Sequence, residues 1–110
     1  MPALIVVLSG PDKGRTFPLA PGATTQVGRG STTATKLTDA TVSRLHCEIA
    51  CEGTKAVLTN QSENGTKVNG EKVERHELRH GDLFTIGNTT LRYLVSELEE
   101  AETIYQPSGK

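Results

Sequence analysis

Apolar residues recur at every second position over short segments of this chain. The clearest example places Leu45, Cys47, Ile49 and Cys51 on one face and His46 on the opposite face. A period of two is typical of a half-buried β-strand. Similar patterns predict further extended segments at Ala3–Ser9, Arg15–Leu19, Thr24–Gly28, Lys55–Thr59, Val73–Leu78, Leu83–Ile86 and Thr90–Val95.

Turn-forming residues separate these segments, and no stretch before residue 96 has a helical period. The pattern therefore predicts an all-β fold, a β-sandwich of about 10–11 short, mostly antiparallel strands. Residues 29–44 are polar and rich in Ser and Thr, which predicts a long loop with a brief extended piece near Leu37. Loops at the ends of a rigid sandwich usually carry the function.

The final segment differs from the rest. Ser96 and Glu99 match a capping box, so one interpretation is a short helix over residues 97–104. The other interpretation is an acidic tail, and both stay open. Because 110 residues suffice for one domain, we expect a β-domain over residues 1–95. Residues 96–110 are then a tail or linker, and a further domain beyond this chain is one interpretation of it.

Composition narrows the function classes. The net charge of −1 argues against a nucleic-acid surface. Cys47 and Cys51 are four residues apart in one predicted strand, at about 3.3 Å of rise per residue, which is too far for a disulfide between them. The sequence shows no signal peptide and no long apolar run, so we expect a reduced, cytoplasmic domain with no membrane role.

Three loop segments carry most of the candidate chemistry. They are Gly28-Arg29-Gly30, Ser43-Arg44-Leu45-His46, and Ser62-Glu63-Asn64-Gly65-Thr66 with Asn69-Gly70 close behind. In this order and spacing they resemble the signature of the forkhead-associated (FHA) domain, and the resemblance spans roughly residues 4–95. It implies an FHA β-sandwich that binds a phosphothreonine-containing protein segment and thereby reads the output of a Ser/Thr kinase. The expected partners are such a kinase or its substrates.

The resemblance also implies roles for individual residues. Arg29 would support the phosphate and the peptide backbone, Ser43 would bind a phosphate oxygen through its hydroxyl and amide, and Arg44 would add to the pocket. Asn64 would hydrogen-bond the peptide main chain just after the phosphothreonine. Glu63 stands where the family often has a hydroxyl or basic residue. Because a carboxylate repels phosphate, we expect only the Glu63 backbone N–H to face it.

A second group is expected to support the site rather than touch the ligand: Gly28, His46, Gly65, Thr66, Asn69 and Gly70. For Asn64, a left-handed turn conformation before Gly65 is a compatible structural role. Residues 36–42, including Lys36, Asp39 and Thr41, are expected to contact peptide positions after the phosphothreonine.

The same residues give less support to other functions. A Ser43–His46 nucleophile pair is disfavoured because residues three apart on a strand point to opposite faces, and we expect no enzyme activity and no cofactor. The soft ligands Cys47, Cys51, His46, His76 and His80 are scattered, so we expect no metal site. A phosphate-independent interaction domain of the same fold stays open as the alternative.

Thr103 lies in the acidic segment after the predicted strands. This context motivates the hypothesis that phosphorylated Thr103 docks on a neighbouring copy of the domain, which would produce self-association, or on its own domain if the tail reaches. The sequence does not identify the partner protein or the residues preferred around the phosphothreonine.

Overall fold

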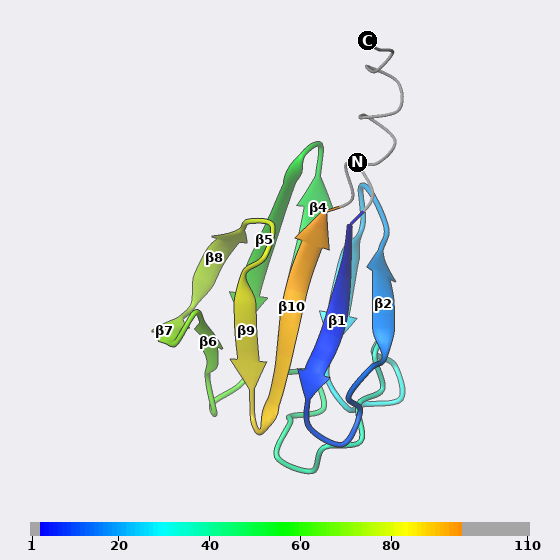
Figure 1. Ribbon diagram of the computed structural model, residues 1–110, viewed down its shortest axis with the longest axis vertical. Coiled ribbons are helices and arrows are strands. Elements are labelled where there is room, and N and C mark those ends of the chain that lie inside the picture. Colours follow the sequence, from blue (N-terminus) through cyan, green and yellow to red (C-terminus); the bar gives the residue numbers. More distant parts are fainter. Residues whose placement is uncertain (1–2, 96–110) are drawn as a thin grey trace, which may run out of the picture.

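The computed structural model describes residues 3–95, which form ten strands and no helix (Figure 1). The strands are β1 (Ala3–Ser9), β2 (Thr16–Leu19), β3 (Thr24–Val27), β4 (Cys47–Glu52), β5 (Lys55–Asn60), β6 (Thr66–Val68), β7 (Glu71–Val73), β8 (Arg75–Leu78), β9 (Leu83–Ile86) and β10 (Thr89–Val95). The predicted helix at 97–104 and Thr103 lie outside the described residues. No helix within residues 3–95 is long and apolar enough to cross a membrane.

Two antiparallel sheets make up the fold, which confirms the predicted β-sandwich. The larger sheet has the order β2-β1-β10-β9-β6-β7, and the smaller has the order β3-β4-β5-β8. At one end, the bottom of Figure 1, lie the β3–β4 loop and the turn between β9 and β10. The opposite end carries the shorter connections between β2 and β3, β4 and β5, and β8 and β9.

Alternating side chains of both sheets fill the core, which is aliphatic except for two cysteines and the aromatic side chains of Phe17, Phe84 and Tyr93. In β4, Cys47, Ile49 and Cys51 are all buried, as the sequence pattern predicts. Both cysteines are free thiols, in agreement with the spacing argument. Burial raises the pKa of Cys47, so this thiol stays protonated and behaves as a small apolar side chain.

Three details of the predicted strands are wrong. β4 begins at Cys47 rather than Leu45, and His46 is fully buried instead of lying on an open face. The predicted strand 73–78 is two strands in different sheets, because β7 pairs with β6 whereas β8 pairs with β5. No strand forms near Leu37, although its side chain is buried in the core.

Candidate functional site

The end of β3 and the segment before β4 lie against each other beyond the regular strands. The backbone N–H of Arg29 donates to the carbonyl of Ser43 at 3.2 Å, and that of Gly30 donates to the carbonyl of Arg44 at 3.0 Å. Gly28 makes this approach possible. A Cβ atom at this position would overlap the Arg44 carbonyl oxygen and lie 2.8 Å from the Ser43 carbonyl oxygen. The glycine is thus required for packing, as the resemblance implies.

Two arginines at this junction are exposed. The Nε atom of Arg29 donates to the carbonyl oxygen of Val42 at 2.6 Å, which anchors the guanidinium and leaves its terminal nitrogens for a ligand. Neither Arg29 nor Arg44 forms an ion pair with any residue between 3 and 95. A planar guanidinium with unused donors is well suited to a phosphate.

His46 connects two of the predicted loop segments. Its Nδ1 accepts a hydrogen bond from the backbone N–H of Ser43 at 3.0 Å, and its Nε2 donates to the carbonyl of Gly65 at 2.8 Å. Burial lowers the pKa of His46, although the Gly65 carbonyl acts in the opposite direction. The ring is therefore neutral at pH 7 and holds the two loops at a fixed separation.

The contact between Ser43 and His46 corrects one sequence-based expectation. The two residues do hydrogen-bond, but through the Ser43 amide, so the imidazole Nδ1 is not free to take a proton from the hydroxyl. The same bond occupies the amide that was expected to contact phosphate. Only the Ser43 hydroxyl then remains as a donor from this residue.

That hydroxyl is paired with another. Ser43 Oγ lies 2.6 Å from Ser62 Oγ, and Ser62 Oγ also accepts the backbone N–H of Asn64 at 3.0 Å. Ser62 is 8% exposed and joins the second loop segment to the third. Ser62 is part of the third loop segment, but the sequence pattern did not assign it a role. The available signal was a serine two residues before Asn64, which is typical of a hydroxyl-capped turn.

The loop between β5 and β6 is closed from within by Asn60, a residue that the sequence did not single out. Asn60 Oδ1 accepts from the Ser62 backbone N–H at 3.2 Å and from Thr66 Oγ1 at 2.9 Å. Asn60 Nδ2 donates to the Ser62 carbonyl at 2.9 Å. This closure leaves the side chains of Glu63 and Asn64 exposed to solvent.

Backbone conformation distinguishes the two Asn-Gly pairs. Asn64 does not have the left-handed conformation proposed for it, which Gly65 adopts instead at φ 85°. Asn69 has the left-handed conformation, at φ 51°, and Gly70 follows it at φ 88°. The Asn69 side chain accepts the backbone N–H of Leu83 at 3.0 Å, so it joins the β6–β7 turn to β9.

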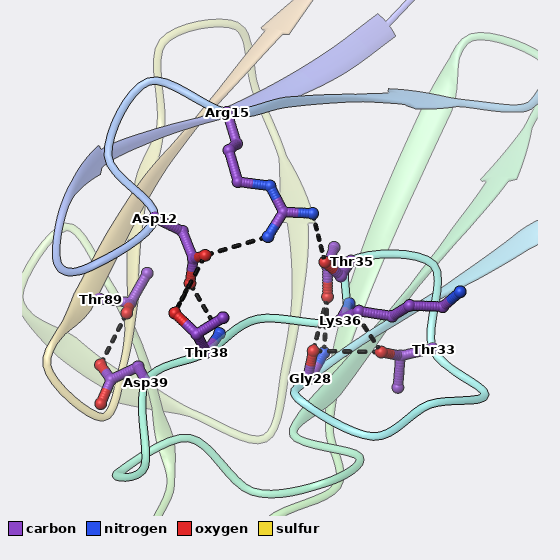
Figure 2. Close-up of polar contacts among 9 residues, drawn as sticks. All are labelled: Asp12, Arg15, Gly28, Thr33, Thr35, Lys36, Thr38, Asp39 and Thr89. Atoms are coloured by element: carbon purple, nitrogen blue, oxygen red, sulfur yellow. Dashed lines mark hydrogen bonds and ion pairs between the residues drawn. The ribbon is translucent and has the colours of Figure 1, made fainter.

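The long β3–β4 loop is folded back on its own first residue (Figure 2). Thr35 Oγ1 accepts the Gly28 N–H at 2.9 Å and donates to the Gly28 carbonyl at 2.8 Å, and Thr33 Oγ1 donates to the same carbonyl at 3.1 Å. Arg15, from the turn after β1, donates to the Thr35 carbonyl at 3.0 Å. The segment that carries Arg29 is therefore fixed on both sides.

Two buried carboxylates attach the rest of this loop to the larger sheet (Figure 2). Asp12 accepts the Thr38 N–H at 2.8 Å, and Asp39 accepts the Thr89 hydroxyl of β10 at 2.7 Å. Burial alone would raise the pKa of Asp39, but hydrogen bonds from Thr41 and Thr89 together hold it below the ordinary value. The expectation that Asp39 contacts the peptide is wrong, because its carboxylate is buried and already bonded.

The predicted site residues thus meet at one end of the sandwich. Arg29, Ser43 and Arg44 lie on the paired β3–β4 segments, and Glu63 and Asn64 lie on the loop that His46 and Ser62 attach to them. Asn69 and Gly70 lie in the neighbouring β6–β7 turn and serve its geometry. No group of three or more metal-ligating side chains occurs within the described part of the chain.

Comparison with known proteins gives consistent matches. The profile of the family described as "FHA domain" matches residues 25–87. The glycogen accumulation regulator GarA of Mycolicibacterium smegmatis is 42% identical over 93 residues, which are 84% of this chain and 58% of GarA. The FHA domain-containing protein FhaA of Mycobacterium tuberculosis is 38% identical over 79 residues, 71% of this chain and 15% of FhaA.

A solved structure from a structural and functional analysis of phosphothreonine-dependent FHA domain interactions is also similar. It superposes with a TM-score of 0.82 at 31% identity, over 89% of this chain and 100% of that one. The present chain spans only part of the two curated relatives, 58% and 15% of their lengths. The activities of those whole proteins therefore do not transfer with the match.

Proposed function

Because this chain belongs to the FHA domain family, we propose that it binds phosphothreonine in a partner protein and so reads the output of a Ser/Thr kinase. The family is a protein-interaction module, and the relative GarA is named as a regulator. The solved FHA structure described above belongs to work on phosphothreonine-dependent interactions. The partner is a protein segment that carries the phosphate.

One observation supports this proposal most strongly. The unpaired guanidinium of Arg29 and the exposed amide of Asn64 belong to loops that His46 and the Ser43–Ser62 hydroxyl pair hold together. A phosphothreonine carries about −1.5 to −2 charges and three acceptor oxygens. A cation and hydroxyl donors fixed beforehand bind it without the cost of ordering each loop.

Each side chain has a distinct task in this proposal. Arg29 contributes the principal charge, and Arg44 adds a second cation at the rim. Ser43 donates its hydroxyl proton to a phosphate oxygen, and the hydroxyl of Ser62, 2.6 Å away, then donates to Ser43 Oγ. Asn64 can donate to and accept from the peptide backbone. Glu63 contributes its backbone N–H, and its exposed carboxylate extends into solvent.

The proposal involves no covalent chemistry. A serine nucleophile needs a base that accepts its hydroxyl proton. The imidazole of His46 cannot serve as this base for Ser43, because its Nδ1 accepts a backbone N–H and its Nε2 donates to a carbonyl. A cytoplasmic location stays a prediction, because Cys47 and Cys51 are too far apart in β4 to form a disulfide in any compartment. Docking of phosphorylated Thr103, on a second copy or on its own domain, stays a prediction.

The test is a calorimetric titration of the chain with a degenerate phosphothreonine peptide library and, in parallel, with the same library without phosphate. We expect Kd values in the micromolar range, about −8 kcal/mol, only with the phosphate. Arg29→Ala should weaken binding by about 10-fold or more, because a hydrogen bond to a charged group is worth about 1.5–3 kcal/mol.

The matched control is Arg79→Ala, which removes an exposed arginine that follows β8 at the opposite end. It should bind like the parent. Equal affinity for both libraries would refute the proposal and favour the phosphate-independent interaction module.

A further inference from the structure

Two lysines next to the proposed site lie directly opposite each other. Lys67 of β6 pairs with Lys72 of β7, and both side chains are exposed. Like charges at directly opposed positions of an antiparallel pair destabilise it. Neither lysine forms an ion pair with any residue from 3 to 95. The pair costs stability, and no ion pair within the described part of the domain offsets that cost.

The two lysines border a hollow that begins at the proposed site. Its lining consists of Asn64, Gly65, Lys67, Lys72, Thr85 and Gly87. No carboxylate is among them. Lys67 also pairs with Thr85 of β9. Lys72, Lys67 and Thr85 therefore form a row across the outer face of the sheet, with two ammonium groups followed by a hydroxyl.

Gly65 lets one lysine lie close to the site. A Cβ atom there would be 2.7 Å from Lys72 Cε, so the aliphatic part of Lys72 crosses the position where any other residue would carry a side chain. The carbonyl of Gly65 accepts the hydrogen bond from His46. The loop that is fixed to the proposed phosphate site therefore also positions Lys72.

We propose that Lys67 and Lys72 bind a second anionic group on the same segment that carries the phosphothreonine. This inference rests on the proposed function. Lys67 is three residues after Asn64, and the turn at Gly65 (φ 85°) shortens this segment, so the two Cα atoms are at most about 10 Å apart. A bound extended peptide covers that distance in about three residues. The anion, a carboxylate or a second phosphate, thus lies within about four residues of the phosphothreonine. The lysines make the domain selective for acidic phosphothreonine segments.

The experiment uses fixed phosphothreonine peptides that differ only in the flanking residues. One has Gln at the four positions on each side; two others have Glu on one side or the other; a fourth carries phosphoserine in place of one Glu. Each is titrated against the parent chain and against Lys67→Gln/Lys72→Gln. The control, Lys55→Gln/Arg79→Gln, removes the same charge at the opposite end, where β5 begins and β8 ends.

We expect acidic residues on one side to tighten binding by about threefold to tenfold, since surface ion pairs contribute modestly. The Lys67→Gln/Lys72→Gln variant should lose this gain and keep its affinity for the Gln peptide; the control should keep both. The gain should also shrink at high salt. A larger lysine-dependent gain with phosphoserine than with Glu would identify a second phosphate as the anion, and the reverse would identify a carboxylate.

Two results would contradict the inference in different ways. If all phosphothreonine peptides bind equally, or if the acidic gain survives in the double variant, the lysine site is refuted and the proposed function stands. If no phosphothreonine peptide binds, the proposed function fails and this inference fails with it.

Discussion

The two ends of the sandwich are built differently. At the end that carries the candidate site, glycines are crowded: a Cβ atom at Gly28 or Gly87 would meet backbone atoms of the β3–β4 loop closer than 3 Å. At the opposite end, a Cβ atom at Gly22, Gly53 or Gly81 would have no neighbour within 4 Å. The first end uses glycine for close packing of loops as well as for a turn at Gly14, and the second uses it for turns.

The two ends also differ in how many polar side chains they bury. The site end buries Asp12, Asp39, Thr35, His46 and Ser62, each with hydrogen-bond partners from other segments. Buried polar groups are costly unless they are satisfied, and a connected network gives rigidity in return. The difference between the ends indicates that the loops at the site are held in place, as a receptor for a small rigid anion requires.

The largest expected effect comes from filling the space at Gly28. Gly28→Ala would push the Arg44 carbonyl away from β3, and we expect a loss of about 2–3 kcal/mol in the free energy of unfolding. The change should also weaken phosphopeptide binding, because Ser43 and Arg44 move with the displaced backbone. Urea unfolding and peptide titration measure the two effects.

Gly53→Asn is the matched change at the other end. Gly53 has φ 58° and open space around it, and Asn tolerates this conformation, so the loss should be within about 0.5 kcal/mol. If Gly28→Ala is as stable as Gly53→Asn, the claimed difference between the ends is wrong.

A smaller effect is expected from pH. Burial keeps the pKa of folded His46 below its ordinary value of 6.5, so the unfolded chain takes up a proton first as the pH falls. Stability should therefore decline below about pH 6.5, by up to about 1 kcal/mol between pH 7 and pH 5.5. Asp12 and Asp39, whose pKa values are lowered, add losses only below about pH 4.

Two variants identify the source of this decline. His46→Asn should be less stable at pH 7 but should lack the decline between pH 7 and pH 5.5. His80→Gln, at an exposed position, should keep it. A decline that persists unchanged in His46→Asn would mean that another group titrates.

The smallest effect concerns Glu63. Its carboxylate is exposed next to the proposed phosphate contact, and Glu63→Gln should raise the affinity for a phosphothreonine peptide about twofold, as for a solvent-screened charge. Glu77→Gln, on β8 of the smaller sheet, is the control and should change nothing. An increase above about tenfold would contradict the outward orientation of the carboxylate.

The sequence predicted more of the sandwich than of the network within the loops. Alternation located the strands because each strand has one buried face, but it did not show the change of sheet near Glu74, which interrupts no apolar pattern. His46 was placed on an open face because its burial depends on Gly65, which is 19 residues away. Ser62 was missed partly for the same reason, since Ser43 is 19 residues away. Asn60 bonds Ser62 and Thr66, which are close in the sequence, but these bonds belong to a turn, and the alternation of apolar residues does not show turn contacts.

The arrangement of the loops was predicted in outline. The resemblance to a family grouped Arg29, Ser43 and Asn64, and the structure brings their loops together at one end. Asp39 was assigned to the ligand together with the whole polar segment 36–42, and acidic residues in such segments are normally exposed. Its actual partner, Thr89, lies 50 residues further along the chain, and no local pattern indicates it.

The most direct test is a map of backbone amide chemical shifts as a phosphothreonine peptide is added to the labelled chain. We predict saturable changes at Arg29, Arg44, Glu63 and Asn64, none at residues 52–55 and 79–82, and none with the unphosphorylated peptide. Changes concentrated at residues 52–55 and 79–82, or equal changes with both peptides, would contradict a phosphate receptor at the end where the β3–β4 loop lies.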